Sequence, residues 1–206
     1  MNDPLAALVA QQLRGRRVVL AVSGGRDSMA LLHAAVTHAR DSIVAVASFD
    51  HATGPHSARA RSLVARVAGE RGVEAITERA TTVVRTEAAW RAQRWRFLDR
   101  VARERKAQIA TAHTRDDQIE TVLMRVMRGA GARGLASLAG ESAIVRPMLA
   151  SSRADVAAYA DRAGIAWIDD PSNVRADHLR NRIRHDLLPA LARARPSLPD
   201  ELLALG

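Results

Sequence analysis

Residues 18–32 read Val-Val-Leu-Ala-Val-Ser-Gly-Gly-Arg-Asp-Ser-Met-Ala-Leu-Leu, and this stretch decides the fold. The β-branched run 18–22 is typical of a short buried strand, and the apolar residues from Met29 onward indicate a helix. Gly24 and Gly25 stand between the two. Because glycine turns tightly and lets a ligand approach the backbone, we expect a strand, a ligand-binding loop and a helix in succession.

The loop itself has the composition of a polyphosphate cradle. Serine hydroxyls can donate hydrogen bonds, and a helix start offers free N–H groups and the positive end of the helix dipole. The Gly-Lys-Ser or Gly-Lys-Thr ending of a Walker A loop is absent. A capped helix start with a glycine turn is the structural alternative, but the coincidence of strand, glycines and serines favours phosphate binding. The predicted phosphate-binding residues are Ser23, Gly24, Gly25, Arg26, Asp27 and Ser28.

Outward from this loop, short apolar runs alternate with helical patterns. Further strands are expected at 43–49, 73–77, 108–112 and 143–146, and further helices at 57–70, 87–105, 114–128, 153–163 and 178–194. Such alternation predicts an α/β fold, a Rossmann-like parallel sheet with helices on both faces, followed by a C-terminal helical tail. We expect an α/β core over residues 1–150 and a helical extension of the same domain over 151–206. Ligands of such sheets bind at the carboxyl ends of the strands.

The charge balance of the chain is strongly basic. Among 206 residues, 31 Lys and Arg against 22 Asp and Glu give a net charge of +9, and Lys106 is the only lysine. The flat arginine fork suits phosphates and base edges, so the surplus favours a nucleic-acid or polyphosphate partner. A G+C-rich genome is the alternative explanation for arginine in place of lysine.

Two absences narrow the class of protein. The chain has no cysteine, which excludes a disulfide framework, a thiolate nucleophile and thiolate-bound iron-sulfur or zinc sites within it. No apolar run reaches the ~18 residues that a membrane span needs, and the first residues do not resemble a signal peptide. We therefore expect a cytoplasmic protein without a membrane partner.

A second polar segment follows the expected strand at 108–112. His113 stands at the strand end, and Asp116 and Asp117 fall in the first turn of the next helix. Thr114 and Asp117 have the spacing of a capping pair, which explains one acid and at most two. As chemistry, a carboxylate here could hold Mg²⁺ across ATP phosphates or accept a proton from an amine. Residues 129–134 match a dinucleotide fingerprint in letters, but they follow a helix, so we reject that interpretation.

The loop Ser-Gly-Gly-x-Asp-Ser resembles that of the N-type ATP pyrophosphatases, the PP-loop family of adenine nucleotide alpha hydrolase type, which cleave ATP between its α and β phosphates. Within that family the segment 112–129 resembles the tRNA(Ile)-lysidine synthetases. The similarity covers about residues 16–190 and includes Arg146-Pro147-Met148-Leu149, Asp170-Pro171-Ser172-Asn173, Arg180-Asn181-Arg182-Ile183-Arg184 and Glu87-Ala88-Ala89. Two departures are Ser48, where the family commonly has histidine, and Arg115, where a small or neutral residue is common.

The resemblance implies an ATP-dependent ligase that joins L-lysine to the wobble cytidine of tRNA(Ile) with anticodon CAU, giving lysidine, AMP and pyrophosphate. It suggests ATP and Mg²⁺ as cofactors and tRNA and L-lysine as partners. The implied catalytic residues are Asp27, His113, Asp116 and Asp117, with Asp27 and Asp117 as metal ligands. Arg128, Arg133 and Arg182 would contact tRNA, although the basic segment around Arg182 could equally be a solvated helix face.

Alternatives remain open at this point. The chain could be another PP-loop ATP pyrophosphatase that forms amides or modifies tRNA, or an ATP-binding module without catalysis. Family members usually continue into C-terminal domains that help to hold tRNA, so we expect either the catalytic part of a longer enzyme or a short member. The oligomeric state is open, a homodimer included.

Overall fold

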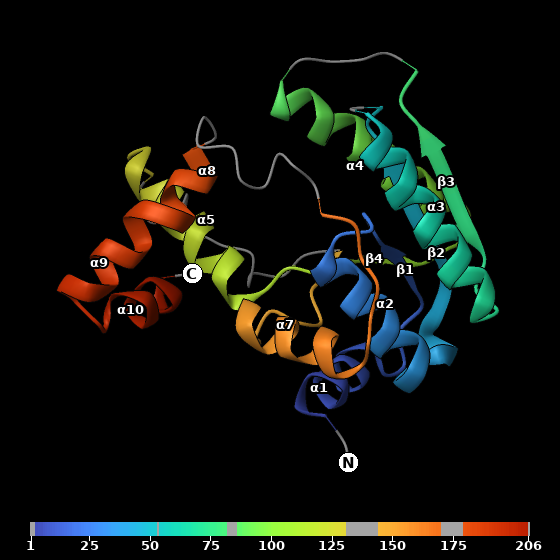
Figure 1. Ribbon diagram of the computed structural model, residues 1–206, viewed down its shortest axis with the longest axis horizontal. Helices are drawn as coiled ribbons and strands as arrows, with labels where there is room; N and C mark the ends of the chain where they lie inside the picture. Colours follow the sequence, from blue (N-terminus) through green and yellow to red (C-terminus); the bar gives the residue numbers. More distant parts are fainter. Residues whose placement is uncertain (1–2, 53, 82–85, 131–143, 170–178, 206) are drawn as a thin grey trace.

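The computed structural model describes residues 3–52, 54–81, 86–130, 144–169 and 179–205. Its centre is a parallel five-stranded sheet in the order β3-β2-β1-β4-β5 (Figure 1). The strands are β1 (Val18–Ala21), β2 (Ile43–Asp50), β3 (Ala75–Arg79), β4 (Gln108–Ala110) and β5 (Ile144–Val145). This confirms the predicted α/β class. The strand order reverses between β1 and β4, and such a switch point is where open parallel sheets bind ligands.

Side chains of β1 alternate between two hydrophobic clusters. Val18 and Leu20 pack with α2 (Arg26–His38), whereas Val19 packs with Phe97 of α4 (Glu87–Glu104) on the other face. The side chains of Val18, Val19 and Leu20 are all fully buried. A strand buried on both faces reads as a continuous apolar run, which is why the sequence identified β1 clearly.

The α2 face of the sheet is the more heavily covered. Besides α2 it carries α1 (Pro4–Leu13), α3 (Pro55–Glu70) and α7 (Arg153–Arg162), and a 3-10 turn (Arg40–Ser42) leads into β2. α1 and α7 both pack against α2. The helix α1 is absent from the sequence prediction, although Leu5, Val9 and Leu13 recur every four residues and are buried.

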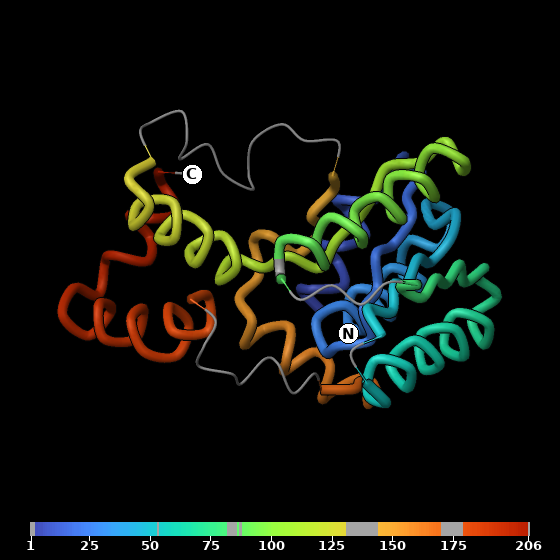
Figure 2. The backbone as a smooth tube through the Cα atoms, turned by 90° about the horizontal axis from the view of Figure 1, so that it is seen from above, coloured from blue at the N-terminus to red at the C-terminus, as the bar shows by residue number. Residues whose placement is uncertain are grey.

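A third cluster joins α5 (Arg115–Met127) to the C-terminal helices. These are α8 (Leu179–Arg182), a π-helical turn (Ile183–Leu187), α9 (Leu188–Ala194) and α10 (Leu198–Ala204), and they lie to one side of the sheet (Figures 1 and 2). The predicted helical segment 178–194 does continue across Pro189. Proline lacks an N–H and clashes with the carbonyl four residues earlier, and here the wider π-helical turn precedes it. α10, like α1, was not predicted.

None of the described helices is long and apolar enough to cross a membrane.

Candidate active site

The phosphate loop joins the carboxyl end of β1 to the start of α2. Gly24 adopts φ +89°, a conformation that favours glycine, and its carbonyl accepts a hydrogen bond from Ile168 N at 3.0 Å. A Cβ added at Gly24 would lie only 2.8 Å from the Ala60 Cβ and 3.0 Å from the Ala60 carbonyl oxygen. Position 24 therefore requires glycine both for its backbone angle and for the close approach of α3.

The loop hydroxyls fix its shape. Ser28 Oγ donates to the Gly25 carbonyl at 2.8 Å and accepts from Ser23 N at 3.2 Å. Gly25, the N-cap of α2, provides no side-chain cap for the helix. Because a helix begins with N–H groups that have no partner within the helix, this start presents donors and a positive dipole end to an anion.

Asp27 lies in the first turn of α2 with one oxygen poorly satisfied. Its Oδ1 is buried and, within the described part of the chain, has no hydrogen-bond partner, although Arg26 Nε is 3.5 Å away. Burial raises the pKa of Asp27 above its usual value, and the attraction of Arg26 and Arg153 offsets only part of this effect. A half-buried carboxyl group with a raised pKa and one oxygen without a hydrogen bond suits a cation or a proton.

The acidic turn after β4 is built on a helix cap. Thr114 Oγ1 accepts from Asp117 N at 3.4 Å, and Asp117 Oδ2 accepts from Thr114 N at 2.9 Å, which is a reciprocal capping box at the start of α5. The predicted capping pair is confirmed. His113 Nδ1 lies 2.7 Å from Thr111 Oγ1, and burial lowers the pKa of His113 to about 4. The imidazole is therefore neutral near neutral pH.

Glu120, one turn along α5, is the most deeply buried acid of the site. Its side chain is 1% exposed and meets three guanidinium groups, from Arg153, Arg180 and Arg184, at 2.7–3.0 Å. Asp117 Oδ1 shares Arg153 and Arg180, each at 3.2 Å. Burial alone would raise the pKa of Glu120, but the hydrogen bonds from Arg184 and Arg180 outweigh it and hold this pKa below its usual value.

The phosphate loop and the acidic turn lie close enough for their charges to interact. Electrostatic interactions link Asp27 to Asp117 and to Arg153, and the guanidinium of Arg184 also acts on Asp27. The backbone N of Arg153, at the start of α7, donates to Asp116 Oδ2 at 2.7 Å. The site thus gathers residues from α2, α5, α7 and the C-terminal helices at the switch point of the sheet.

The predicted tRNA-contacting arginines lie in three different settings. Arg128 is exposed at the C-cap of α5, Arg182 is exposed on α8, and Arg133 lies outside the described residues. The sequence prediction omitted Arg153, Arg180 and Arg184 as site residues and did not select Glu120. The four-residue spacing of Arg180 and Arg184, which places both on one helix face, was the signal that could have identified them.

The two predicted metal ligands, Asp27 and Asp117, differ in how readily they could bind Mg²⁺. Asp27 offers a buried oxygen without a hydrogen bond, whereas both Asp117 oxygens already have donors from Thr114 or arginine. In the described ranges, no three His, Asp or Glu side chains converge as a metal site. Metal binding by Asp27 is compatible with this arrangement, and binding by Asp117 would require the arginines to move.

Comparisons with known proteins agree with this geometry. The family model of the PP-loop domain matches residues 2–191. The tRNA(Ile)-lysidine synthase of Geobacter sulfurreducens is 39% identical over 204 residues, covering 91% of this chain and 43% of that protein. The tRNA(Ile)-lysidine synthase of Bradyrhizobium sp. is 40% identical over 188 residues, covering 85% of this chain and 52% of that protein. The chain thus spans about half the length of the curated relatives it matches.

Solved structures show the same fold at low identity. The U34-tRNA thiolase NcsA from Methanococcus maripaludis superposes with a TM-score of 0.77 at 14% identity, covering 97% of this chain and 75% of that one. An NH3-dependent NAD synthetase from Campylobacter jejuni gives a TM-score of 0.52 at 12% identity, covering 97% and 89%.

Proposed function

Because the chain belongs to the PP-loop family, we propose that it uses ATP to ligate L-lysine to the wobble cytidine of tRNA(Ile) with anticodon CAU. The products would be lysidine, AMP and pyrophosphate. One observation carries the proposal: Asp27 of the phosphate loop lies within electrostatic reach of Asp117 and of Arg153, which hydrogen-bonds both acids of the acidic turn. The chain is also about 39% identical to proteins named tRNA(Ile)-lysidine synthase.

The first step would activate the base. The carbonyl oxygen of the cytosine ring attacks the α-phosphorus of ATP, the bond between that phosphorus and the bridging oxygen breaks, and pyrophosphate leaves. The N-terminus of α2 and the loop from Ser23 to Ser28 would hold the departing pyrophosphate. Arg26, exposed to about a third, would add a charge at this position.

Mg²⁺, where bound, would neutralise phosphate charge, and we assign it to Asp27. The buried Oδ1 of this residue, which has no hydrogen bond, and its raised pKa support the choice, because a cation beside a partly desolvated carboxylate offsets the cost of its charge. Asp117 remains a second predicted ligand, one that would first have to give up its contacts with Arg153 and Arg180.

The second step would consume lysine. Its ε-amine, of pKa about 10.4 in solution, arrives protonated and must lose a proton before it attacks the activated carbon and displaces AMP. We assign the ammonium to Asp116, whose side chain is the most exposed of the site acids at 37%. Within the described ranges, the cation beside its Oδ1 is Arg153, 4.0 Å away. His113, neutral and hydrogen-bonded to Thr111, would orient groups beside Asp117.

The tRNA would be held by arginines at the rim. Arg128 is exposed at the C-cap of α5, the end of that helix away from the acidic turn, Arg182 is exposed on α8, and Arg133 belongs to the same proposal. Guanidinium groups bind phosphates by paired hydrogen bonds, which positions an RNA without reading its sequence. A cytoplasmic location and a homodimer are further predictions, the second of which sedimentation equilibrium would test.

The deciding experiment measures pyrophosphate release with ATP, L-lysine and a tRNA(Ile) transcript, each omitted in turn. Release that needs all three supports the proposal. Release that needs ammonia in place of lysine would instead indicate an amide-forming PP-loop enzyme, and ATP binding without release would indicate a non-catalytic module. A transcript with the wobble cytidine replaced by uridine is the matched substrate control and should give no release.

A further inference from the structure

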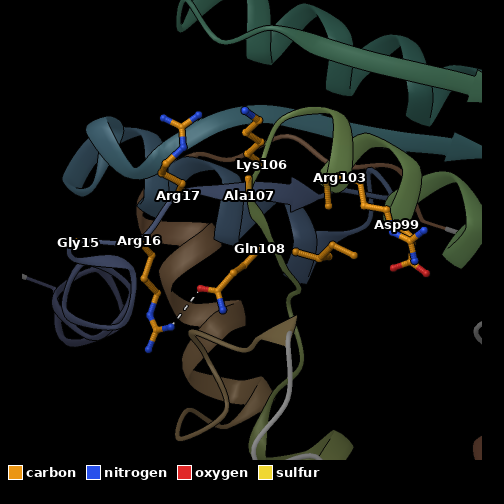
Figure 3. A pocket seen from close by; sticks show the side chains of 10 residues that line it. Gly15, Arg16, Arg17, Asp99, Arg103, Lys106, Ala107 and Gln108 are labelled. Atoms are coloured by element: carbon orange, nitrogen blue, oxygen red, sulfur yellow. Dashed lines mark hydrogen bonds between the residues drawn. The ribbon is translucent and has the colours of Figure 1, made fainter.

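A basic hollow lies at the edge of the sheet opposite the phosphate loop. It has a volume of about 740 Å³ and is lined by two loops, residues 15–17 before β1 and 106–107 before β4, together with the last turns of α4 (Figure 3). Gln108 N donates to the Arg17 carbonyl at 2.8 Å, which ties the two loops together. We call this surface the amino-edge hollow.

Cations dominate its ionisable lining. Arg16, Arg17, Arg103 and Lys106 stand against a single acid, Asp99. Arg17 donates to the Arg105 carbonyl at 3.3 Å, and Arg16 donates to the Gln12 carbonyl and to Gln108 Oε1. These acceptors are neutral, so the hydrogen bonds orient the guanidinium groups without cancelling their charge. Among the described residues, none of the four cations forms an ion pair, and all four are exposed.

Lys106 also adopts an unfavourable, left-handed backbone conformation. It has φ +49° just after the C-cap of α4, a position that usually holds glycine. A lysine there costs stability because its Cβ is crowded in the left-handed region. A non-glycine residue kept in such a conformation, in a basic hollow, is a reason to look for a ligand of the side chain.

The shape and charge of the amino-edge hollow indicate what kind of ligand it binds. The hollow is open and has cations on two loops and a helix, which suits a chain of phosphates better than one small anion. Its apolar lining is limited to Ala102, Ala107 and Ile109, too little to insert into a lipid bilayer. We propose that the amino-edge hollow binds the phosphodiester backbone of RNA, as a second contact to the substrate away from the reacting base.

This inference rests on the proposed function only for the identity of the RNA. The four residues of β1 separate the hollow from the phosphate loop by about 13 Å of strand. At ~3.4 Å per nucleotide along a strand, an RNA that reaches both must extend at least about four nucleotides beyond the reacting one.

The test compares Lys106→Gly with Arg66→Gln, each of which removes one exposed positive charge. Arg66 lies on α3, pairs with Glu70 and is the matched control. The dissociation constant for a full-length tRNA transcript is measured between about 50 and about 200 mM salt. Loss of one phosphate contact should lower the slope of log affinity against log salt by about 0.7–0.9 and weaken binding about fivefold to tenfold at 0.1 M salt. Arg103→Gln/Lys106→Gly should about double the change in slope.

Stability separates binding from folding in this experiment. Lys106→Gly relieves the left-handed strain, so its Tm should rise by about 2–4 °C while tRNA binding weakens. An unchanged salt slope in both Lys106 variants would overturn the inference. So would a variant that no longer co-sediments with phosphatidylserine vesicles, as the wild type does, but binds tRNA as before. Because binding needs no catalysis, absence of lysine-dependent pyrophosphate release would refute the proposed function alone.

Discussion

Arg184 and Glu120 form a two-bond ion pair between positions 64 residues apart. Arg184 Nε lies 2.7 Å from Glu120 Oε1 and Nη2 lies 3.0 Å from Oε2, the fork-to-fork arrangement that guanidinium and carboxylate groups favour. Arg184 belongs to the C-terminal helices and Glu120 to the helix that begins at the acidic turn. The pair therefore fastens the C-terminal helices to the candidate active site through a carboxylate that solvent scarcely reaches.

Glu120→Gln should destabilise the fold strongly. The substitution removes the acid that the three guanidinium groups share, so that Asp117 becomes their main acidic partner. Removal of one partner from a buried ion pair costs about 3–5 kcal/mol. Urea unfolding measures the loss. Glu70→Gln, which breaks the exposed pair with Arg66, is the control and should cost less than about 0.5 kcal/mol. Equal losses in the two variants would contradict the importance of the buried cluster.

Arg184→Gln should destabilise the fold, whereas Arg182→Gln should leave stability unchanged and weaken tRNA binding. Arg184 is a buried-cluster residue, so its loss should lower the free energy of unfolding by about 2–4 kcal/mol. Arg182 is exposed, so its loss should change that free energy by less than about 0.5 kcal/mol. If Arg182 contacts tRNA as proposed, its variant weakens tRNA binding in a filter assay. A destabilised Arg182 variant would argue against the orientation of α8 described above.

Gly24→Ala should damage the phosphate loop, and Gly25→Ala should not unfold it. A methyl group at position 24 meets Ala60 at 2.8 Å and must adopt φ +89°, a combination that should cost about 2–4 kcal/mol. At position 25 the nearest atom is Ser23 Oγ at 3.7 Å, and φ is −77°. Thermal unfolding compares the two variants. A Gly24 variant as stable as Gly25→Ala would show that α3 can move away from the loop.

His113 should make the protein less stable as the pH falls below neutrality. Its pKa is about 4 in the folded chain, and an exposed histidine in the unfolded chain has a pKa near 6.5, so the unfolded state binds the proton first. Stability should then decline from about pH 6.5 toward pH 4, by up to about 3 kcal/mol in total. His33, whose pKa burial also lowers, contributes in the same direction.

The variant His113→Gln isolates this effect. Between about pH 6.5 and pH 5 its stability should fall less steeply than that of the wild type, because the buried neutral imidazole no longer has to take up a proton. The carboxylates with lowered pKa values, Asp117 and Glu120, lose stability only at still lower pH. Parallel pH profiles for the two proteins would show that His113 is solvated.

Asp27→Asn should abolish pyrophosphate release and leave the fold intact. Loss of a charged group from the phosphate-binding site should lower the rate at least about 100-fold. Because folding raises the pKa of Asp27, the charged form is disfavoured in the native state, and the neutral asparagine should keep or raise the Tm near neutral pH. Normal release from a folded Asp27→Asn protein would refute the role assigned to this residue.

The strands, the phosphate loop and the acidic turn could be predicted along the chain. Each has a local signal in the sequence: the apolar run of β1, the glycine pair at Gly24, and the three-residue spacing of Thr114 and Asp117. Local geometry of this kind follows from backbone preferences and side-chain spacing, so it can be read along the chain. Because parallel strands end at one edge, the sequence also placed the two loops together.

Which charged side chains meet in the candidate site depends on how the helices pack. Along the sequence, Glu120 is one more acid on α5, and Arg182 is as suitable as Arg180 or Arg184. The packing of α10 and the π-helical turn against α5 brings Arg180 and Arg184, but not Arg182, to Glu120. The free energy of a buried ion pair depends on the distance and desolvation of groups that lie 33–64 residues apart in the chain. No local pattern encodes that distance. It is set when the helices pack.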